Sequence, residues 1–434
     1  MKTKTTHLLG GCSLLVGMAD SAFISPMKNI VFLGILAFAT FSRAESLLRP
    51  VLQSFVDKHI APGVVTLVAN KERVLDLEAE GYASLANKTP MRKDAMFWIA
   101  SMSKSLTGTA LMMLVDEGKV SLDDPVEKHL PEFKGQQVKD ADGVLHLPMH
   151  PITVREIMNH TSGLVLANEK SLKKTQSLKE NVTFIAALPL RQEPGTKYEY
   201  NNCGIDTGGR IIEVVSGMSY SDFMQKRLFD PLGMKDTTFW PNEEQASRLA
   251  HTARMTADKK ALEEIKQDKD IEQRVIDKWS EGVHVPHALT ADMGAGVAFN
   301  YAKHYGEPAG GFYSTASDIG TFCRMLLNGG ELDGRRYLSE QAVKQMSGIQ
   351  TGDVPVSPQE AYGVGWSVKI KDDEGPSIGS FGHRGARRTA MWIDPKNELV
   401  MVILVERFDM TGEEQKIMYG GFMKAAVMAY RIKP

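Results

Sequence analysis

Strand patterns gather at the two ends of this 434-residue chain, while helical patterns fill its middle. Asn70-Lys71 supplies a turn between the first two strands, and Asp394-Pro395-Lys396-Asn397 predicts a hairpin between the last two. The simplest architecture is α/β (α+β): an antiparallel sheet built from the N- and C-terminal segments, flanked by helices, with a mostly helical region inserted. The predicted strands cover residues 63–69, 73–79, 365–370, 379–383, 389–393 and 399–405.

Apolar residues at helix spacing predict four helices, over residues 45–59, 101–117, 208–215 and 410–432. Residues 257–279 are highly charged and carry Glu/Lys pairs at the same spacing. We therefore divide residues 45–434 into two parts. The α/β part covers about residues 45–130 and 300–434, and the helical part covers about residues 131–299. A cleft between them is the expected place for a site.

The first 44 residues have the pattern of a leader. Lys28 precedes an apolar run, Ile30 to Phe41, and Ser42-Arg43-Ala44 places small residues near a cleavage site. We expect a signal peptide that starts at Met27, and therefore a periplasmic or secreted protein. Because the apolar run is short for a membrane span, a membrane contact is expected only through an uncleaved leader.

The composition is that of an ordinary globular protein, with 43% hydrophobic and 24% charged residues. A formal net charge of -2 gives no reason to expect a nucleic-acid partner. The sequence shows no zinc-ligand spacing and no P-loop, so we expect no metal, no cofactor, and a small-molecule or peptide substrate. Three cysteines exclude a disulfide framework, although Cys203 and Cys323 leave a single bridge open.

Ser101-Met102-Ser103-Lys104 is an S-x-x-K motif that follows a short apolar run and opens the predicted helix at residue 101. Three helical residues turn about 300°, so Ser101 and Lys104 share a face. An amine one turn above a hydroxyl can accept its proton, and the helix N-terminus favours the negative charge that develops. Two other S-x-x-K strings, Ser25–Lys28 and Ser171–Lys174, lack this setting.

Tyr200 and Asn202 stand two residues apart, and in a locally extended chain they would point the same way. Tyr200 could carry a proton between a serine and a leaving group, while Asn202 could hold Lys104 or a substrate carbonyl. The plainer interpretation is that Tyr198 and Tyr200 simply pack.

His383-Arg384-Gly385 lies in a strand pattern near the C-terminus, where a glycine lets a substrate backbone approach a strand edge. The alternative is a histidine with a purely structural role. A rival nucleophile, Ser377, lies in Gly375-Pro376-Ser377-Ile378-Gly379, which matches G-x-S-x-G but has no helix pattern after it. The two motifs predict different nucleophiles.

These motifs, in this order, resemble the serine β-lactamase/penicillin-binding-protein superfamily, and most closely its class C β-lactamase-like branch, which includes family VIII carboxylesterases. The resemblance covers roughly residues 47–430. It implies a β-lactamase/transpeptidase-like fold. Further matching segments are Ile152-Thr153-Val154-Arg155, His160-Thr161-Ser162-Gly163-Leu164, Asp230-Pro231-Leu232-Gly233-Met234, Ala309-Gly310-Gly311 and Tyr362-Gly363-Val364-Gly365-Trp366.

The resemblance also implies roles for residues. Ser101 would be the acylated nucleophile, with Lys104 and Tyr200 as the activating pair and Asn202 lining the site. The third motif of the family maps to His383-Arg384-Gly385, and the oxyanion hole would use the backbone N–H groups of Ser101 and Ala386. The family usually has Lys-Thr-Gly at the third motif, whereas this chain has His383 and Arg384.

This departure favours an esterase or small peptidase over a dedicated β-lactamase, because the missing lysine belongs to the region that recognises a β-lactam carboxylate. Arg384, Arg387 or Arg388 could replace its charge, or could be solvated. The expected function is a serine hydrolase that forms an acyl-enzyme on esters, amides or small D-peptides. The alternatives are a D-alanyl-D-alanine carboxypeptidase, a weak β-lactamase, and a catalytically silent binding protein of the cell envelope.

Overall fold

The computed structural model of this protein describes residues 46–165, 177–265, 305–373 and 375–431. The chain divides into two units, Met1–Ala44 and Glu45–Pro434, and all described residues belong to the second. The predicted leader lies outside the described residues. Within the part of the chain that is described, no helix has the length and apolarity needed to cross a bilayer.

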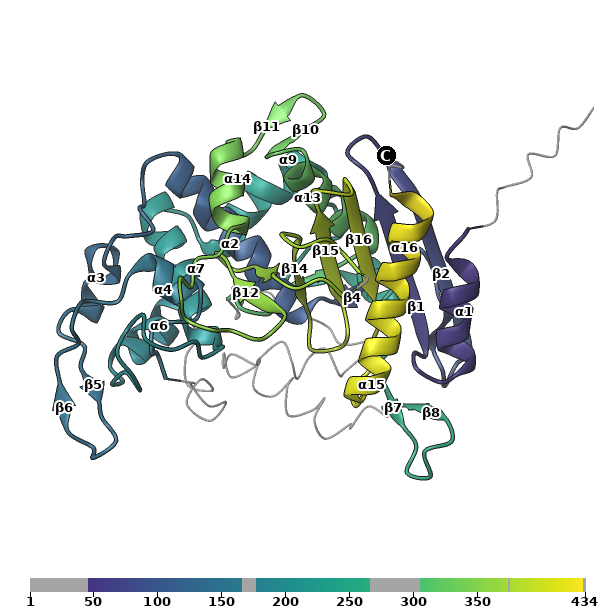
Figure 1. Ribbon diagram of the computed structural model, residues 1–434, viewed down its shortest axis with the longest axis horizontal. Coiled ribbons are helices and arrows are strands. Elements are labelled where there is room, and N and C mark those ends of the chain that lie inside the picture. The colour runs from purple at the N-terminus through teal and green to yellow at the C-terminus, as the bar shows by residue number, and fades with distance from the viewer. Residues whose placement is uncertain (1–45, 166–176, 266–304, 374, 432–434) are drawn as a thin grey trace, which may run out of the picture. The chain divides into compact units, whose positions relative to one another are not determined.

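An antiparallel sheet of eight strands joins the two ends of the described chain, as predicted (Figure 1). The N-terminal hairpin enters the sheet through β1, which pairs with β16 from Val65 opposite Leu404 to Ala69 opposite Val400. In spatial order, the strands are β12 (Glu360–Tyr362), β13 (Ser367–Lys369), β14 (Phe381–Arg384), β15 (Ala390–Asp394), β16 (Leu399–Leu404), β1 (Gly63–Ala69), β2 (Val74–Ser84) and β3 (Thr89–Pro90).

Helices cover both faces of this sheet, so every residue of β1 is buried. Leu67 belongs to the core shared with α13 (Ala316–Leu327), and Val68 to the core shared with α1 (Arg49–Asp57) and α16 (Gly421–Tyr430). Successive strand residues point to opposite faces, which explains why neighbouring residues enter different cores. Gly320 lets α13 lie close to the sheet, since a Cβ there would be 2.7 Å from Leu67.

The central helix α2 packs against α7 and α14, and its residues 103–114 are all buried. A helix that is apolar on most sides belongs at the centre of a large core. The described helices between the two strand groups in sequence, apart from α13, are α2 (Ser103–Asp116), α3 (Val126–His129), α4 (Val154–Met158), α6 (Leu178–Ala186), α7 (Asn202–Ser216), α8 (Tyr220–Phe223), α9 (Asp230–Leu232), α10 (Glu243–Ser247) and α14 (Glu340–Ser347).

Short two-stranded sheets complete the described fold. They are β4 (Phe97–Trp98) with β9 (Tyr313–Ser314), β5 (Val138–Lys139) with β6 (Leu145–His146), β7 (Ala253–Met255) with β8 (Leu262–Glu264), and β10 (Glu331–Leu332) with β11 (Arg335–Arg336). The predicted C-terminal helix is found as α15 (Gly412–Gln415), a π-helical stretch (Lys416–Gly420) and α16.

The helical interpretation of residues 257–279 is wrong for the part that is described. Residues 253–264 form the β7–β8 hairpin. Charges pair across its strands, and Arg254 Nε lies 2.9 Å from Glu263 Oε1. Asp258 accepts a hydrogen bond from Thr256 Oγ1 in the connecting turn. Alternating charges can pair across a hairpin as well as along a helix, which is why the pattern misled. Residues 266–279 lie outside the described part.

Candidate active site

Ser101 lies where a short strand meets the central helix. β4 ends at Trp98, a 3₁₀ turn covers Ala100–Met102, and α2 begins at Ser103. Ala100 adopts a left-handed backbone with φ of 46°, which is unfavourable for a residue with a Cβ. Such strain gathers at functional sites, where the surrounding fold holds it in place. The result is a half-buried serine at the head of α2, as the sequence predicts.

Lys104 lies one turn further along α2 and is completely buried. Its Nζ donates hydrogen bonds to Ser101 Oγ at 3.1 Å and to the Ala309 carbonyl at 2.7 Å. The same Nζ is 4.9 Å from the centre of the Tyr200 ring. The structure therefore brings together the three residues predicted to be catalytic.

The start of α7 positions Tyr200. Asn201 caps this helix in an extended conformation: its side chain accepts from the Gly204 N–H and donates to the Leu164 carbonyl. An N-cap of this kind fixes the chain direction at the helix head. Tyr200, just before the cap, is 39% exposed, and Asn202, just after it, is also exposed. Both predicted residues therefore stand at the surface of the helix head.

His383 lies on β14 beyond the part of that strand that pairs with β13, since only Phe381 and Gly382 have partners there. Its Nδ1 is 2.8 Å from the Arg384 carbonyl, which can only accept, so Nδ1 carries the proton. Its Nε2 consequently accepts from the Tyr362 hydroxyl at 2.8 Å. Burial and the positive charge of Lys104 lower the pKa of His383 to about 3, so the ring is neutral.

His160 adds a second neutral imidazole beside Tyr200. Its ring centre lies 4.5 Å from that of Tyr200 and 4.7 Å from that of Tyr362, and its Nδ1 accepts from the Asn201 N–H at 3.4 Å. Burial, followed by the charge of Lys104, holds the pKa of His160 well below its ordinary value. Two uncharged imidazoles therefore lie close to Tyr200, the ring that Lys104 faces.

Gly385 and Ala386 follow β14 and approach the strand end that precedes Ser101. A Cβ at Gly385 would lie 2.5 Å from the Ile99 carbonyl oxygen, so only glycine fits this approach. Ala386 is exposed. Among the described residues, the N–H groups of Ser101 and Ala386 donate no hydrogen bond. Two such donors are what an oxyanion hole requires.

Arg384 is turned away from the side of the strand where His383 lies, because consecutive strand residues point to opposite faces. It pairs with Glu360 at 2.7 Å. Its guanidinium centre also lies 5.4 Å from the ring centre of Trp392 and 5.8 Å from that of Tyr419. Ion pairing and cation–π contacts therefore hold this arginine on the outer face of β14.

The other two arginines near the third motif, Arg387 and Arg388, also contact protein groups. The guanidinium centre of Arg387 lies 5.6 Å from the Trp98 ring centre and 4.8 Å from the Phe408 ring centre. Arg388 donates to the carbonyls of Phe408 and Met410. All three arginines that could replace the charge of the missing lysine therefore contact other protein groups.

Ser377 has none of the partners that a nucleophile needs. It lies in the turn between β13 and β14, and its Oγ accepts a hydrogen bond from Asn397 Nδ2 at 2.9 Å. Its backbone N–H donates to Asp394. The next element after Ser377 is the strand β14, whereas the nucleophile elbow would require a helix there. The residues that match G-x-S-x-G thus form a turn, which Ser377 holds against the β15–β16 hairpin.

Ala309, His160 and Tyr362 were given no predicted role, although each stands in a segment that carried the resemblance. Asp206 was not predicted either; it is buried in α7 and accepts from the Ala309 N–H at 3.2 Å. Asp206 is the only charged residue in the first half of α7, residues 202–209, and this was the available signal.

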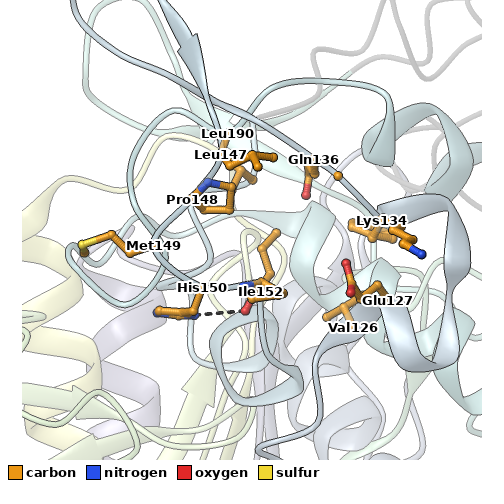
Figure 2. A pocket seen from close by; sticks show the side chains of 13 residues that line it. Val126, Glu127, Lys134, Gln136, Leu147, Pro148, Met149, His150, Ile152 and Leu190 are labelled. Atoms are coloured by element: carbon orange, nitrogen blue, oxygen red, sulfur yellow. Dashed lines mark hydrogen bonds between the residues drawn. The ribbon is translucent and has the colours of Figure 1, made fainter.

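Other candidate sites in the described residues lie apart from Ser101. Figure 2 shows a pocket between α3 and the segment after β6, lined by Val126, Met149 and His150 among others, and no predicted catalytic residue lines it. Cys203 and Cys323 are buried, and no disulfide joins them. No group of three or more potential metal ligands occurs within the described ranges.

Comparisons with known proteins identify the class of protein to which this fold belongs. The Beta-lactamase family model matches residues 48–419, and the chain belongs to that family. It is 28% identical to Protein Rv1367c of Mycobacterium tuberculosis (strain H37Rv) over 383 residues, which is 82% of this chain and 88% of that protein.

The chain also resembles two other known proteins, one in sequence and one in structure. It is 26% identical over 381 residues, 80% of its length and 79% of the other, to a Salmonella agona protein provisionally named a D-alanyl-D-alanine carboxypeptidase. Its structure resembles that of EstCE1, a hydrolase with promiscuous acyltransferase activity, with a TM-score of 0.67, 22% identity, and coverage of 88% of this chain and 97% of that one. The predicted fold class is confirmed.

Proposed function

We propose that this protein is a serine hydrolase that cleaves neutral carboxylic esters through an acyl-enzyme on Ser101. The observation that carries the proposal is the hydrogen bond of 3.1 Å from Lys104 Nζ to Ser101 Oγ, within a buried environment that Tyr200 closes on one side. A nucleophile in contact with a desolvated amine is the usual arrangement for activating a serine.

The reaction has two steps. The Ser101 oxygen bonds to the ester carbonyl carbon while its proton passes to the Lys104–Tyr200 pair. The carbon–oxygen bond to the alcohol then breaks, and the alcohol leaves with that proton. Water then attacks the acyl carbon and gives a proton to the same pair. The pair passes this proton to the Ser101 oxygen as its bond to the acyl carbon breaks and the acid is released. In both steps the N–H groups of Ser101 and Ala386 would bind the oxyanion.

The contacts that the three arginines near the third motif make with protein groups indicate the substrate class. β-Lactams and D-alanyl peptides carry a carboxylate close to the bond that breaks, and a cation near the third motif would bind it. Arg384, Arg387 and Arg388 are held by other groups, and His383 is neutral. These observations support an uncharged ester as the preferred substrate.

A substrate panel tests this proposal. Wild-type protein and Ser101→Ala are assayed with short-chain p-nitrophenyl esters, nitrocefin and D-alanyl-D-alanine peptides, and Ser377→Ala serves as the matched serine control. We expect ester turnover in the wild type and in Ser377→Ala, and its loss in Ser101→Ala. Preferred turnover of the peptides or nitrocefin would contradict the substrate class. Binding without turnover on every compound would indicate a silent binding protein.

We also propose that the protein is exported, because residues 27–44 have the pattern of a signal peptide. Expression of the full chain in a bacterium, followed by cell fractionation and N-terminal sequencing, tests it. We expect a periplasmic or secreted protein that begins near residue 45, whereas an uncleaved cytosolic protein would contradict it.

A further inference from the structure

Lys104 has no carboxylate in ion-pair contact among the described residues, although it is completely buried. A buried ammonium without compensation is costly, so its surroundings must supply negative charge or oriented dipoles. Its closest acceptor is the Ala309 carbonyl at 2.7 Å. The position of Ala309 therefore decides how Lys104 is held against Ser101.

Side chains of α2 and β4 hold the carbonyls on either side of Ala309. Thr107 Oγ1 donates to the Pro308 carbonyl at 2.7 Å, and Trp98 Nε1 donates to the Gly310 carbonyl at 2.7 Å. On its other side, Ala309 donates its N–H to Asp206 Oδ1 at 3.2 Å. Asp206 is thus the side chain on α7 that holds the residue whose carbonyl faces Lys104.

Asp206 is itself fixed and enclosed. Its second oxygen accepts from Asn181 Nδ2 on α6 at 3.2 Å, and only 7% of the residue is exposed. Burial, followed by the negative charge of Glu307, raises the pKa of Asp206 to about 7, whereas Lys104 lowers it. The charged and titratable groups around it are therefore Lys104 on α2, Glu307 before β9, and Tyr220 on α8, whose pKa the carboxylate raises.

We propose that Asp206 is a positioning residue which, when ionised, holds the Ala309 carbonyl on Lys104 and supplies the nearby negative charge that keeps this amine in place for proton transfer. The inference rests on the proposed function. A charged acceptor makes a stronger hydrogen bond than a neutral one, so protonation of Asp206 weakens the hold on Ala309. Activation of Ser101 should therefore follow the ionisation of a group that does not touch the substrate.

Asp206→Asn separates the charge from the hydrogen bond. The new amide oxygen can still accept from the Ala309 N–H. Its NH₂ group would face Asn181, whose Oδ1 is buried without a partner and becomes an acceptor if that amide turns over. The variant therefore keeps the packing and the hydrogen-bond count and removes only the charge.

The experiment measures the second-order rate constant for fluorophosphonate labelling of Ser101 from about pH 5.5 to about pH 9. In the wild type we expect the rate to rise with a midpoint near 7, in keeping with the raised pKa of Asp206. The two neighbouring histidines, with their lowered pKa values, do not titrate there. Asp206→Asn should lose this rise and label about tenfold more slowly above pH 8.

Two further variants complete the test. Asn181→Ala removes a donor that lowers the pKa of Asp206, so the midpoint should move to higher pH. Asp318→Asn is the matched control, because Asp318 is a buried carboxylate with a pKa raised to about 6 that bonds Thr237 instead of Ala309. It should keep the wild-type midpoint.

Each outcome decides one point. Asp206→Asn with the rate and midpoint of the wild type would overturn the positioning role. So would an unmoved midpoint in folded Asn181→Ala. Wild-type protein that is not labelled at Ser101 at any pH would instead refute the proposed function, and the role of Asp206 would fall with it.

Discussion

Asp206 makes the stability of the folded protein depend on pH, and Asp206→Asn should remove that dependence. Burial raises the pKa of this carboxyl from the ordinary 3.8 to about 7. The difference is about 3 pH units, and each unit corresponds to about 1.4 kcal/mol, so ionising Asp206 costs the folded state about 4 kcal/mol.

The sign follows from proton counting. Between about pH 4 and pH 7 the folded state keeps the Asp206 proton while the unfolded state has lost it. The free energy of unfolding therefore falls as the pH rises through this window, and it stays at the lower value above pH 7. The stabilising contribution is complete only below the unfolded-state pKa.

Urea unfolding of the wild type and of Asp206→Asn at about pH 5 and about pH 8 measures the effect. The difference in unfolding free energy between the two proteins should change by about 3 kcal/mol, with the variant gaining relative stability at the higher pH. Other titrating groups are common to both proteins and cancel. A difference that does not change with pH would refute the raised pKa of this buried carboxyl.

Three other substitutions have defined outcomes. Gly385→Ala places a Cβ 2.1 Å from Thr389 Oγ1, so it should destabilise the protein by about 1–3 kcal/mol in thermal unfolding and abolish ester hydrolysis; unchanged values for both would contradict the close approach. Tyr362→Phe removes the donor to His383 Nε2 and should cost about 1–3 kcal/mol in chemical denaturation, and an unaltered midpoint would show that the bond contributes nothing. Arg384→Ala should leave the ratio of ester to nitrocefin turnover unchanged, whereas a shift in this ratio would show that Arg384 contacts substrate.

The sheet could be predicted because its strands carry local signals. Residues 63–69 were predicted as a strand and β1 has the same bounds, and residues 399–405 differ from β16 by one residue. These segments are apolar, short and bounded by turn residues, so local pattern and tertiary position agree. The helix predicted for residues 257–279 is wrong where the structure describes it, because the charge spacing there suits a hairpin as well as a helix.

The proximity of Ser101, Lys104 and Tyr200 could also be predicted, because Ser101 and Lys104 share a helix turn and Tyr200 completes a motif of the superfamily that the sequence resembles. The rest of the site depends on contacts between distant segments. His383 meets Tyr362 across 21 residues, and Lys104 meets Ala309 across 205. A single sequence has no local pattern for such pairs. The protonation state of His383 follows from burial, which likewise becomes known only from the fold.

The most direct test of the account is the site of covalent modification. The wild-type protein is treated with a fluorophosphonate and digested, and the adduct is located by peptide mass spectrometry. The account predicts a single adduct on Ser101, absent from Ser101→Ala and retained in Ser377→Ala. An adduct that persists in Ser101→Ala, or that maps to Ser377, would contradict it.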